Sequence, residues 1–399
     1  MARRRLLIIG NGMAGLRFLE ELVERAPGRF DITAIGAEPV AAYNRVLLTS
    51  LLAGAIGADD VRLRPDAWYA GHSIKLVTGQ GALALDVTGR RAVLCGGQWL
   101  PFDTLVLATG ATPIRLDVSG ADLAGVATLR TLEDIDRLAR AAAIAPVVVI
   151  GGGALGIEAA YGLARRGAHV SLVQLADRLM ERQLDPEGAR LLAAALEASG
   201  VRILLGAEVR ALRGSSRVKA VELADGRRLE CHLAVMAVGI RPATALASQA
   251  GLKVCRGIVV DDRMQTSAPG IFAIGECAEH RGVCYGLLEP CYAQARVAAA
   301  TLAGEAQSFM GSIPATHLKL SAIPVCSIGA LDANDSIVVR DAGVPSYRKL
   351  VVADGRLKGA VLVGDTENAL WYEELIRAGA SVAPLGEKLA FGPAFAEAA

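Results

Sequence analysis

Two segments of the chain share one pattern of apolar and polar positions. Each begins with an apolar run, Leu6–Ile9 in the first segment and Val147–Ile150 in the second. Each run leads into three spaced glycines and then into apolar residues at helical spacing. A second short apolar run follows in each, over residues 31–35 and 169–173. The pattern predicts two β-α-β units, and such a crossover produces a parallel sheet with helices on its faces.

The rest of the chain carries weaker patterns. Residues 77–93 have β character, with a turn at Thr88 and Gly89, and the apolar run from Leu105 ends in a turn at Gly110. Helices are expected around Gly188–Ala198, from about Pro290 to Leu302 and from about Glu367 to Ala378, and strands near Ser346–Ala353 and Lys358–Val363. The pattern of apolar and polar positions changes beyond Ile313, and this change predicts a third, α+β domain.

The glycines of both repeats follow a G-x-G-x-x-G spacing directly after a strand and at the start of a helix. In this context the first glycine allows a tight turn, the second lets a pyrophosphate approach the backbone, and the third lets helix pack against strand. The phosphates then meet the positive end of the helix dipole. One copy alone is compatible with an ordinary turn, whereas two copies in register favour two dinucleotide sites. The residues concerned are Gly10, Gly12, Met13, Ala14 and Gly15 in the first copy, and Gly151, Gly153, Ala154, Leu155 and Gly156 in the second.

The second strand of such a unit commonly ends in an acid that binds the adenosine ribose. Glu38 fits this place in the first unit, although a solvated loop carboxylate is the alternative. In the second unit the corresponding residue is Gln174, which lacks the charge that repels a 2′-phosphate. No arginine follows at once, but Arg178 is near. The sequence therefore leaves NADH and NADPH both open, with NADH mildly favoured.

Two dinucleotide sites in one chain indicate two dinucleotides that work together, usually a tightly held flavin and a transient nicotinamide. At this point the sequence resembles the rubredoxin, ferredoxin and nitrite reductase branch of the flavoprotein disulfide-reductase-like superfamily. Within it, the chain looks like the N-terminal FAD/NAD(P)H part of the assimilatory nitrite reductase large subunit and its free-standing relatives that serve nitrate reductases. The resemblance covers nearly the whole chain. It rests on the segments Ile9–Gly15, Tyr43–Leu48, Leu107–Gly110, Leu179–Asp185 and Ile274–Gly282.

The resemblance implies a glutathione-reductase-like α/β fold with two Rossmann-like dinucleotide-binding domains and a smaller C-terminal α+β domain. It implies an FAD-binding domain over residues 1–112 and 237–312, an NAD(P)H-binding domain over 113–236 and a C-terminal domain over 313–399. No residue of the chain is expected to be catalytic by itself, because the flavin accepts the hydride.

The resemblance also assigns roles to single positions. It places Arg45 at the FAD pyrophosphate, Ala108, Thr109 and Gly110 over the flavin nucleotide, Gly275 and Glu276 at the ribityl chain, and Gly239 at the return crossover. Glu158 is expected near the nicotinamide carboxamide, with a surface carboxylate as the alternative. Glu289, beside the helix expected from Pro290, is expected to influence the flavin potential unless it points into solvent.

Three departures from the wider family limit the chemistry. Many ferredoxin-type reductases have a lysine soon after the arginine loop, and here Thr49 and Ser50 stand there, so no lysine ion pair is expected at the flavin. No C-x₄-C pair lies near Tyr43 to Leu52, which argues against disulfide reduction. No cysteine follows Cys326, where a full nitrite reductase continues into iron–sulfur and sirohaem modules, so we do not expect this chain to reduce nitrite alone.

Composition excludes several other classes. The 42 Lys+Arg residues nearly balance 41 Asp+Glu, and 4% of residues are aromatic, so nothing indicates nucleic-acid binding. The mean hydropathy is +0.39, but the longest apolar stretch, residues 141–164, contains a proline, three consecutive glycines and a glutamate, so we expect no membrane span. The seven cysteines and five histidines show no metal-site spacing. These features predict a cytoplasmic protein without a bound metal.

The sequence therefore predicts an FAD-dependent NAD(P)H oxidoreductase that passes electrons to a separate redox protein. The first candidate partner is the catalytic subunit of an assimilatory nitrate or nitrite reductase. A reductase of rubredoxin, ferredoxin or a haem protein is the second reading, and a non-catalytic FAD/NAD-binding or sensing protein is the third. The sequence is compatible with a homodimer, and it leaves the acceptor and the flavin potential undetermined.

Overall fold

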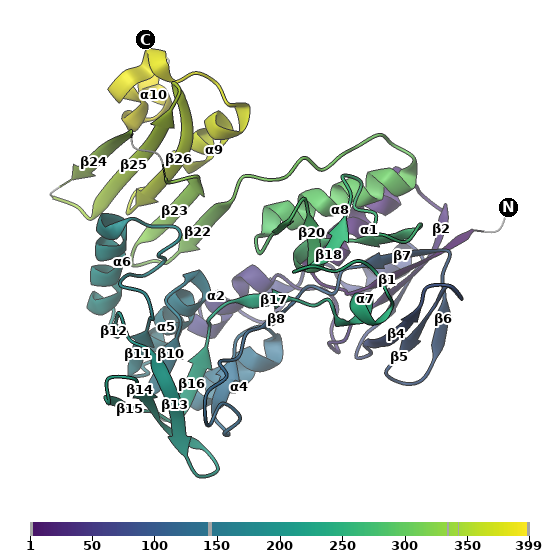
Figure 1. The fold of residues 1–399 in the computed structure, drawn as a ribbon, viewed down its shortest axis with the longest axis horizontal. Helices are drawn as coiled ribbons and strands as arrows, with labels where there is room; N and C mark the ends of the chain where they lie inside the picture. The colour runs from purple at the N-terminus through teal and green to yellow at the C-terminus, as the bar shows by residue number, and fades with distance from the viewer. Residues whose placement is uncertain (1–2, 143–145, 333–334, 342, 397–399) are drawn as a thin grey trace. The chain divides into compact units, whose positions relative to one another are not determined.

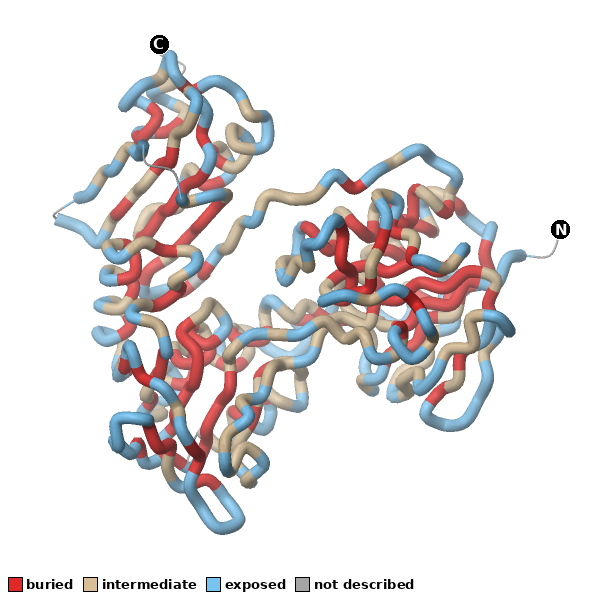
Figure 2. Tube along the Cα trace, viewed as in Figure 1, coloured by how far each residue is buried: buried red, intermediate tan, exposed pale blue. Residues whose placement is uncertain are grey.

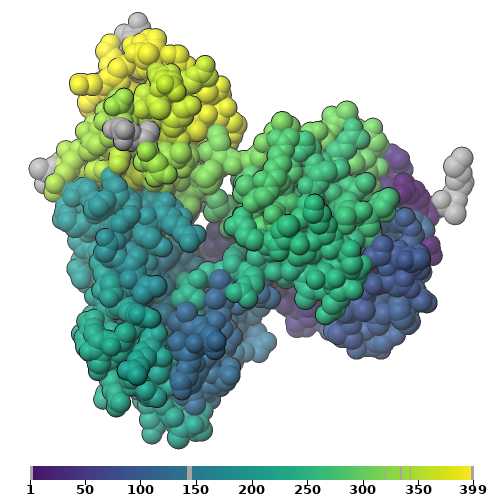
Figure 3. Space-filling model, in the orientation of Figure 1, coloured from purple at the N-terminus to yellow at the C-terminus, as the bar shows by residue number. Residues whose placement is uncertain are grey.

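The computed structural model describes residues 3–142, 146–332, 335–341 and 343–396. By its internal contacts this part of the chain divides into two compact units (Figure 1). Unit 1 comprises residues 1–47, 57–112 and 240–312, and unit 2 comprises residues 48–56, 113–239 and 313–399. In the space-filling view the purple and green stretches of unit 1 lie together although they are far apart in the sequence (Figure 3).

Unit 1 is built on a parallel sheet in the order β19-β7-β1-β2-β3. Strand β1 pairs in parallel with β2 on one side and with β7 on the other. The sheet strands and their connecting helices are β1 (Arg4–Ile9), α1 (Met13–Arg25), β2 (Phe30–Ile35), η1 (Arg45–Leu47), η2 (Asp59–Val61), α3 (Asp66–Gly71), β3 (Ile74–Val77), β7 (Thr104–Leu107) and β19 (Ile271–Ala273). The predicted first β-α-β unit is therefore confirmed.

Two smaller sheets and a long helix complete unit 1. An antiparallel sheet consists of β4 (Ala82–Asp86), β5 (Arg91–Leu94) and β6 (Trp99–Pro101), and a second small sheet of β18 (Ile258–Val260), β20 (Ala278–His280) and β21 (Val283–Cys284). The remaining elements are β8 (Ala111–Pro113), which runs on into unit 2, β17 (Ile240–Pro242), α7 (Ala245–Gln249), η3 (Gly275–Cys277) and α8 (Leu288–Ala303). Helix α8 packs along α1, and both contribute buried apolar residues to one core with the sheet (Figure 2).

Helix α8 begins two residues earlier than predicted. Leu287 precedes it with extended backbone, and the first helical residue is Leu288, so Glu289 lies inside the first turn. Pro290 is the third helical residue and not the first. Its missing N–H costs nothing there, because the N–H groups of a first turn have no intrahelical acceptor.

Unit 2 contains the second parallel sheet, in the order β12-β11-β10-β16-β9. Strand β10 pairs in parallel with β11 and with β16. The elements around this sheet are α2 (Leu48–Ala53), β9 (Val126–Thr128), α4 (Leu132–Ala142), β10 (Val147–Ile150), α5 (Ala154–Arg165), β11 (Val170–Val173), α6 (Pro186–Ala198), β12 (Val201–Leu204), β13 (Val209–Gly214), β14 (Val218–Leu223), β15 (Arg228–Glu230) and β16 (Leu233–Met236). The second predicted β-α-β unit is likewise confirmed, which confirms the predicted α/β fold class.

The residues beyond Ile313 form an antiparallel sheet in the order β22-β23-β26-β25-β24, with helices beside it. Its elements are β22 (Ala315–Lys319), β23 (Pro324–Gly329), β24 (Ser336–Asp341), β25 (Ser346–Ala353), β26 (Arg356–Val363), α9 (Ala369–Ala378), η4 (Ala383–Phe391) and α10 (Pro393–Ala396). The sequence pattern predicted β25, β26 and α9 but missed β22 to β24. The expected α+β character is confirmed, whereas the expected domain boundaries stay a prediction.

Asp185 connects the second β-α-β unit to the C-terminal sheet within unit 2. Its carboxylate caps α6 by accepting the Gly188 N–H at 3.1 Å. The same carboxylate accepts the Tyr347 hydroxyl at 2.5 Å and lies 3.4 Å from the Lys349 ammonium. Burial and this carboxylate both raise the pKa of Tyr347, so the phenol stays protonated and remains a donor.

We expect Asp185→Ala to destabilise the protein by about 1–3 kcal/mol, because the change removes a helix cap and leaves the buried phenol of Tyr347 without its acceptor. The urea midpoint, followed by circular dichroism, measures the loss. Asp177→Ala is the control, since the Asp177 side chain is 82% exposed and pairs with its sequence neighbour Arg178. Equal midpoints for the two variants would contradict the assigned role of Asp185.

Candidate dinucleotide-binding sites

The two glycine loops have the same geometry. Gly10 and Gly151 adopt φ of +115° and +113°. A Cβ atom at Gly10 would lie 2.0 Å from the Ala108 carbonyl oxygen, and one at Gly151 would lie 2.4 Å from the Ala237 carbonyl oxygen. Side chains are therefore excluded at both positions by backbone atoms of a neighbouring strand, and by a conformation that L-residues rarely adopt.

The third glycine of each loop lets the helix approach the strand. A Cβ atom at Gly15 would lie 2.1 Å from the Gly10 carbonyl oxygen, and one at Gly156 would lie 1.9 Å from that of Gly151. Such distances are impossible for real atoms, so any side chain here would push the helix away. The helix N-terminus, with its unpaired N–H groups, is thereby held beside the end of the parallel sheet.

The second glycine of each loop faces open space. Around a Cβ atom at Gly12 or Gly153, the described part of the chain places no atom within 4 Å. Neither glycine provides a side-chain cap for α1 or α5. Each loop therefore offers backbone N–H donors, a positive helix end and space for a bulky anion, and these features fit the pyrophosphate of a dinucleotide.

Glu38, Tyr43 and Arg45 form a cluster in unit 1, after strand β2. Both carboxylate oxygens of Glu38 are bound, one by the Tyr43 hydroxyl at 2.6 Å and the other by the Arg45 guanidinium. The guanidinium also lies over the Tyr43 ring, 4.9 Å from its centroid. The backbone N–H of Arg45 contacts the sulfur of Met13 at 3.3 Å. Arg45 therefore lies beside the first turn of α1 and carries its charge next to the glycine loop.

Tyr43 is a site residue that the sequence argument named only as part of a motif. Its side chain is buried, with 4% of the residue exposed. It holds one oxygen of Glu38 while Arg45 holds the other, so the orientation of the carboxylate is fixed. Glu38 lies in a loop with 28% of its side chain exposed, and its contact with a ribose stays a prediction.

The remaining predicted FAD-site residues come together at the ends of β7 and β19. Thr109 donates its hydroxyl to the Ala243 carbonyl at 2.8 Å, which ties the end of β7 to the segment after β17. Gly275, at φ +80°, lies so close to α1 that a Cβ atom there would be 3.0 Å from the Ala14 Cβ. Its N–H donates to the Gln294 side-chain oxygen at 2.8 Å. Glu276 follows directly in the short helix η3.

Gln174 lies at the expected place in unit 2 but has partners within the protein. Its side-chain oxygen accepts the Gly152 N–H at 2.7 Å, and its NH₂ group donates to the Glu181 carboxylate at 2.9 Å. Gln174 therefore holds the second glycine loop in shape. Glu181 brings to this edge the negative charge that Gln174 lacks. The sequence argument missed Glu181, because the loop fold and not the spacing brings it back to the strand end.

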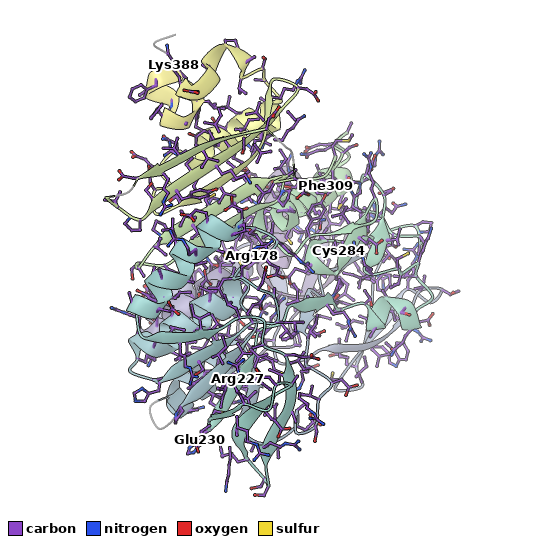
Figure 4. The ribbon with its side chains drawn as sticks, turned by 60° about the vertical axis from the view of Figure 1, so that its left-hand side comes forward. Arg178, Arg227, Glu230, Cys284, Phe309 and Lys388 are labelled. Atoms are coloured by element: carbon purple, nitrogen blue, oxygen red, sulfur yellow. The ribbon has the colours of Figure 1, made fainter. Side chains whose placement is uncertain are left out.

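Arg178, labelled in Figure 4, is held by the protein on several sides. Its guanidinium donates to the carbonyls of Leu184 and Glu181 at 3.2 Å each and pairs with Asp177 at 2.9 Å. An arginine so engaged must break these contacts before it can bind a 2′-phosphate. This arrangement lowers its suitability for NADPH.

Glu158 of α5 is half-buried and accepts a hydrogen bond from the Thr49 hydroxyl of α2 at 2.9 Å. Burial raises the pKa of this carboxyl, and the Thr49 bond opposes the shift. The alternative of a surface carboxylate is therefore wrong. Thr49 stands where many relatives are expected to have a lysine, and here it supplies an uncharged donor to a carboxylate. Proximity to the nicotinamide stays a prediction.

Glu289 is the weakest of the predicted site residues. Its side chain is 58% exposed and pairs with Arg296 of the same helix at 2.7 Å. The arginine offsets its charge, and solvent screens what remains. Its influence on a flavin stays a prediction, with a smaller expected effect than the sequence alone suggested.

Gly239, at φ +112°, accepts the Ile114 N–H at the crossover, at 3.0 Å.

Four cysteines lie in surroundings that disfavour the thiolate. Burial raises the pKa of Cys231 and Cys326 to about 12 and also raises that of Cys277. Cys284, labelled in Figure 4, has a raised pKa as well.

Across the described ranges, no three His, Cys, Asp or Glu side chains gather as a metal site would require. Among the same residues, no helix is long and apolar enough to span a bilayer.

Residues 4–303 match the family described as pyridine nucleotide-disulphide oxidoreductase, and residues 314–380 match the domain described as rubredoxin NAD+ reductase C-terminal domain. The chain belongs to the pyridine nucleotide-disulphide oxidoreductase family. This membership confirms the resemblance seen in the sequence. It agrees with the interpretation of the two glycine loops as nucleotide sites.

Two curated relatives and one solved structure specify the likeness further. The chain is 42% identical to the nitrite reductase [NAD(P)H] of Bacillus subtilis over 92% of its own length and 46% of the relative's. It is 39% identical to the assimilatory nitrate reductase electron transfer subunit of the same organism, over 92% and 48%. The structure of a covalent putidaredoxin reductase–putidaredoxin complex matches with a TM-score of 0.89 at 30% identity, over 96% of this chain and 95% of that one. The chain spans about half the length of these two curated relatives.

The raised pKa of Glu158 predicts a pH-dependent stability. In the unfolded chain this carboxyl ionises near its ordinary pKa, whereas in the folded chain it keeps its proton to higher pH. The folded state therefore loses stability relative to the unfolded state as pH rises through that interval. Glu158→Gln keeps an acceptor for Thr49 and removes the buried charge, so we expect a higher Tm than the parent at pH 8 and a shrinking difference towards pH 5.

Differential scanning fluorimetry between pH 5 and 8 measures this difference. Glu197→Gln, on the exposed side of α6, is the control for a general charge effect and should leave the Tm difference flat with pH. A lower Tm for Glu158→Gln at pH 8 would show that the ionised carboxylate is stabilising and would contradict the assignment.

Proposed function

We propose that this chain is an FAD-dependent NAD(P)H oxidoreductase that delivers electrons to a separate redox protein. The observation that supports it best is the duplicated glycine cradle, in which Gly12 and Gly153 face open space at the start of a helix. Residues 1–112 and 237–312 would hold FAD, residues 113–236 would hold NAD(P)H, and residues 313–399 would form a third domain. The cytoplasmic location expected from the sequence belongs to the same proposal.

The FAD-site residues would divide the work along the nucleotide. The N–H groups around Gly12 would bind the pyrophosphate, with Arg45 adding a charge that the nucleotide can share with Glu38. Glu38, held in orientation by Tyr43, would accept the adenosine ribose hydroxyls. Thr109 and Gly110 would cover the nucleotide, and Glu276 would bind the ribityl chain. When bound, FAD supplies an atom that accepts hydride and releases electrons one at a time.

The NAD(P)H site would be built by the same rules. The N–H groups beside Gly153 would bind its pyrophosphate, while Gln174 keeps the loop in shape and Glu181 provides a ribose acceptor. Glu158 would orient the nicotinamide carboxamide, with Thr49 fixing the direction of its carboxylate. None of these side chains has to be a nucleophile or a proton donor to reacting carbon.

For the partner, we propose the catalytic subunit of an assimilatory nitrate or nitrite reductase. The two curated relatives described above are named a nitrite reductase [NAD(P)H] and an assimilatory nitrate reductase electron transfer subunit, and each is about twice the length of the matched region. The match of residues 314–380 to a rubredoxin reductase domain supports the second candidate, a reductase of rubredoxin, ferredoxin or a haem protein. NADH-driven reduction rates with each purified acceptor distinguish the two, because the true partner should saturate at low micromolar concentration.

We expect the purified protein to be yellow, with one FAD per chain, and to lose its flavin absorbance within seconds of NADH addition under anaerobic conditions. Flavin extraction with absorbance against protein concentration gives the stoichiometry. Gly12→Asp should prevent flavin uptake, since a carboxylate would occupy the phosphate space. A flavin that binds but is not bleached by NADH or NADPH would favour the non-catalytic reading, and a protein that takes up no FAD would end the proposal.

We expect NADH to reduce the flavin about two- to tenfold faster than NADPH, because Glu181 opposes a 2′-phosphate and Arg178 is engaged by backbone carbonyls. Stopped-flow bleaching at matched cofactor concentrations measures the ratio. Glu181→Gln should lower the ratio of the NADH rate to the NADPH rate. Glu187→Gln, in α6, should leave this ratio unchanged. A tenfold preference for NADPH, about 1.4 kcal/mol, would show that an arginine captures the phosphate after all.

A further inference from the structure

Helix α5 places three residues against the short helix α2 at intervals of four positions. Glu158, Gly162 and Arg166 lie along one face of α5, with Arg166 at its C-terminal cap. Helix α2 packs on this face (Figure 1). Its Thr49 donates its hydroxyl to Glu158 at 2.9 Å. One face of α5 therefore brings a predicted nicotinamide-site residue and two further residues to the same small helix.

Gly162, in the middle of this face, lets the two helices approach closely. A Cβ atom at Gly162 would lie 3.3 Å from the Thr49 carbonyl oxygen and 3.4 Å from the backbone nitrogen of Ala53. Thr49 stands near the start of α2 and Ala53 at its end, so α2 meets α5 through its backbone. The distance from the Thr49 hydroxyl to Glu158 is thus set by how closely α2 packs on α5.

Arg166 binds the C-terminal end of α2. Its guanidinium donates to the backbone carbonyl of Leu52 and, at 3.3 Å, to that of Leu51. The last carbonyls of a helix lack an α-helical donor, and a positive group beside them is favourable. Arginine suits two successive carbonyls because its N–H groups form a fixed fork. A helix of six residues is not stable alone, so α2 depends on contacts of this kind for its position.

We propose that Arg166 is a positioning residue of the nicotinamide site. It acts through α2 and not by touching the dinucleotide. By fixing α2 on α5 it directs the Thr49 hydroxyl to the carboxylate of Glu158, which is thereby held in the direction that meets the carboxamide. The inference rests on the proposed function, because it takes Glu158 as the group that orients the nicotinamide. If Arg166 only stabilised the fold, its loss would affect every ligand of this dinucleotide site alike.

The experiment measures the dissociation constants of NAD⁺ and of ADP-ribose for the oxidised protein by isothermal titration calorimetry. ADP-ribose has the adenosine and pyrophosphate of NAD⁺ but lacks the nicotinamide, so it cannot meet Glu158. We expect Arg166→Ala to weaken NAD⁺ binding about three- to tenfold, as for one lost hydrogen bond, and ADP-ribose binding less than about twofold. Thr49→Val should give the same pattern. Arg165→Ala is the matched control and should leave both constants unchanged, because Arg165 is the exposed neighbour of Arg166 with the same charge.

The double variant Arg166→Ala/Thr49→Val tests whether the two residues act through one contact. Its loss of NAD⁺ affinity should not exceed that of the stronger single variant, since each change alone already disturbs the bond to Glu158. Losses that multiply would show that Arg166 does not act through Thr49. Equal losses for NAD⁺ and ADP-ribose in Arg166→Ala would show a role in stability alone. Either result overturns the inference, as does parent-like NAD⁺ binding in Arg166→Ala.

Gly162→Ala covers the case in which Arg166→Ala fails to fold. The change keeps every charge, and alanine favours the helix, but the added methyl group must displace α2 from α5. We expect it to weaken NAD⁺ binding more than ADP-ribose binding, and an equal effect on the two ligands, or none, overturns the inference. A parent protein that binds neither NAD⁺ nor ADP-ribose would instead refute the proposed function, so the two failures are distinguishable.

Discussion

The contact between the glycine loop and its neighbouring strand is the constraint on which both nucleotide sites depend. At Gly10 and Gly151 a carbonyl oxygen of the adjacent strand occupies the place of a side chain, and at Gly15 and Gly156 the carbonyl of the loop itself does so. Backbone packs on backbone without any side chain between. This close approach brings the end of the helix to the carboxyl edge of a parallel sheet, where a nucleotide phosphate meets unpaired N–H groups.

Each unit has its own glycine loop, and the two units use different side chains around it for equivalent purposes. In unit 1 the carboxylate of Glu38 is oriented by the Tyr43 hydroxyl and the Arg45 guanidinium. Gly275, which has a positive φ, is held by the side-chain amide of Gln294 from α8. In unit 2 an amide at the strand end holds the loop, and a carboxylate from the following loop supplies the charge. Under the proposed function, this difference would suit a tightly held cofactor in unit 1 and a transient cofactor in unit 2.

Polar contacts within unit 2 also link elements that are distant in the sequence. Thr49 of α2 donates to Glu158 of α5, and Tyr347 of the C-terminal sheet donates to the cap of α6. The first link joins the helix of the second glycine loop to α2, and the second joins α6 to the C-terminal sheet. Because buried polar groups are costly when unpaired, these links fix the direction of the side chains as well as the packing of the helices.

The sequence by itself determined the two β-α-β units, their glycine loops and the family, because these features depend on local patterns: an apolar run, glycines at fixed spacing and helical periodicity. It also located Glu38, Gln174 and Glu158, but not what they contact. Only the tertiary structure showed that Gln174 serves the loop while Glu181 supplies the charge, that Thr49 pairs with Glu158, and that Arg166 binds the end of α2. The residues of these pairs lie in different elements or in irregular loops, so only the folded chain brings them within hydrogen-bond distance.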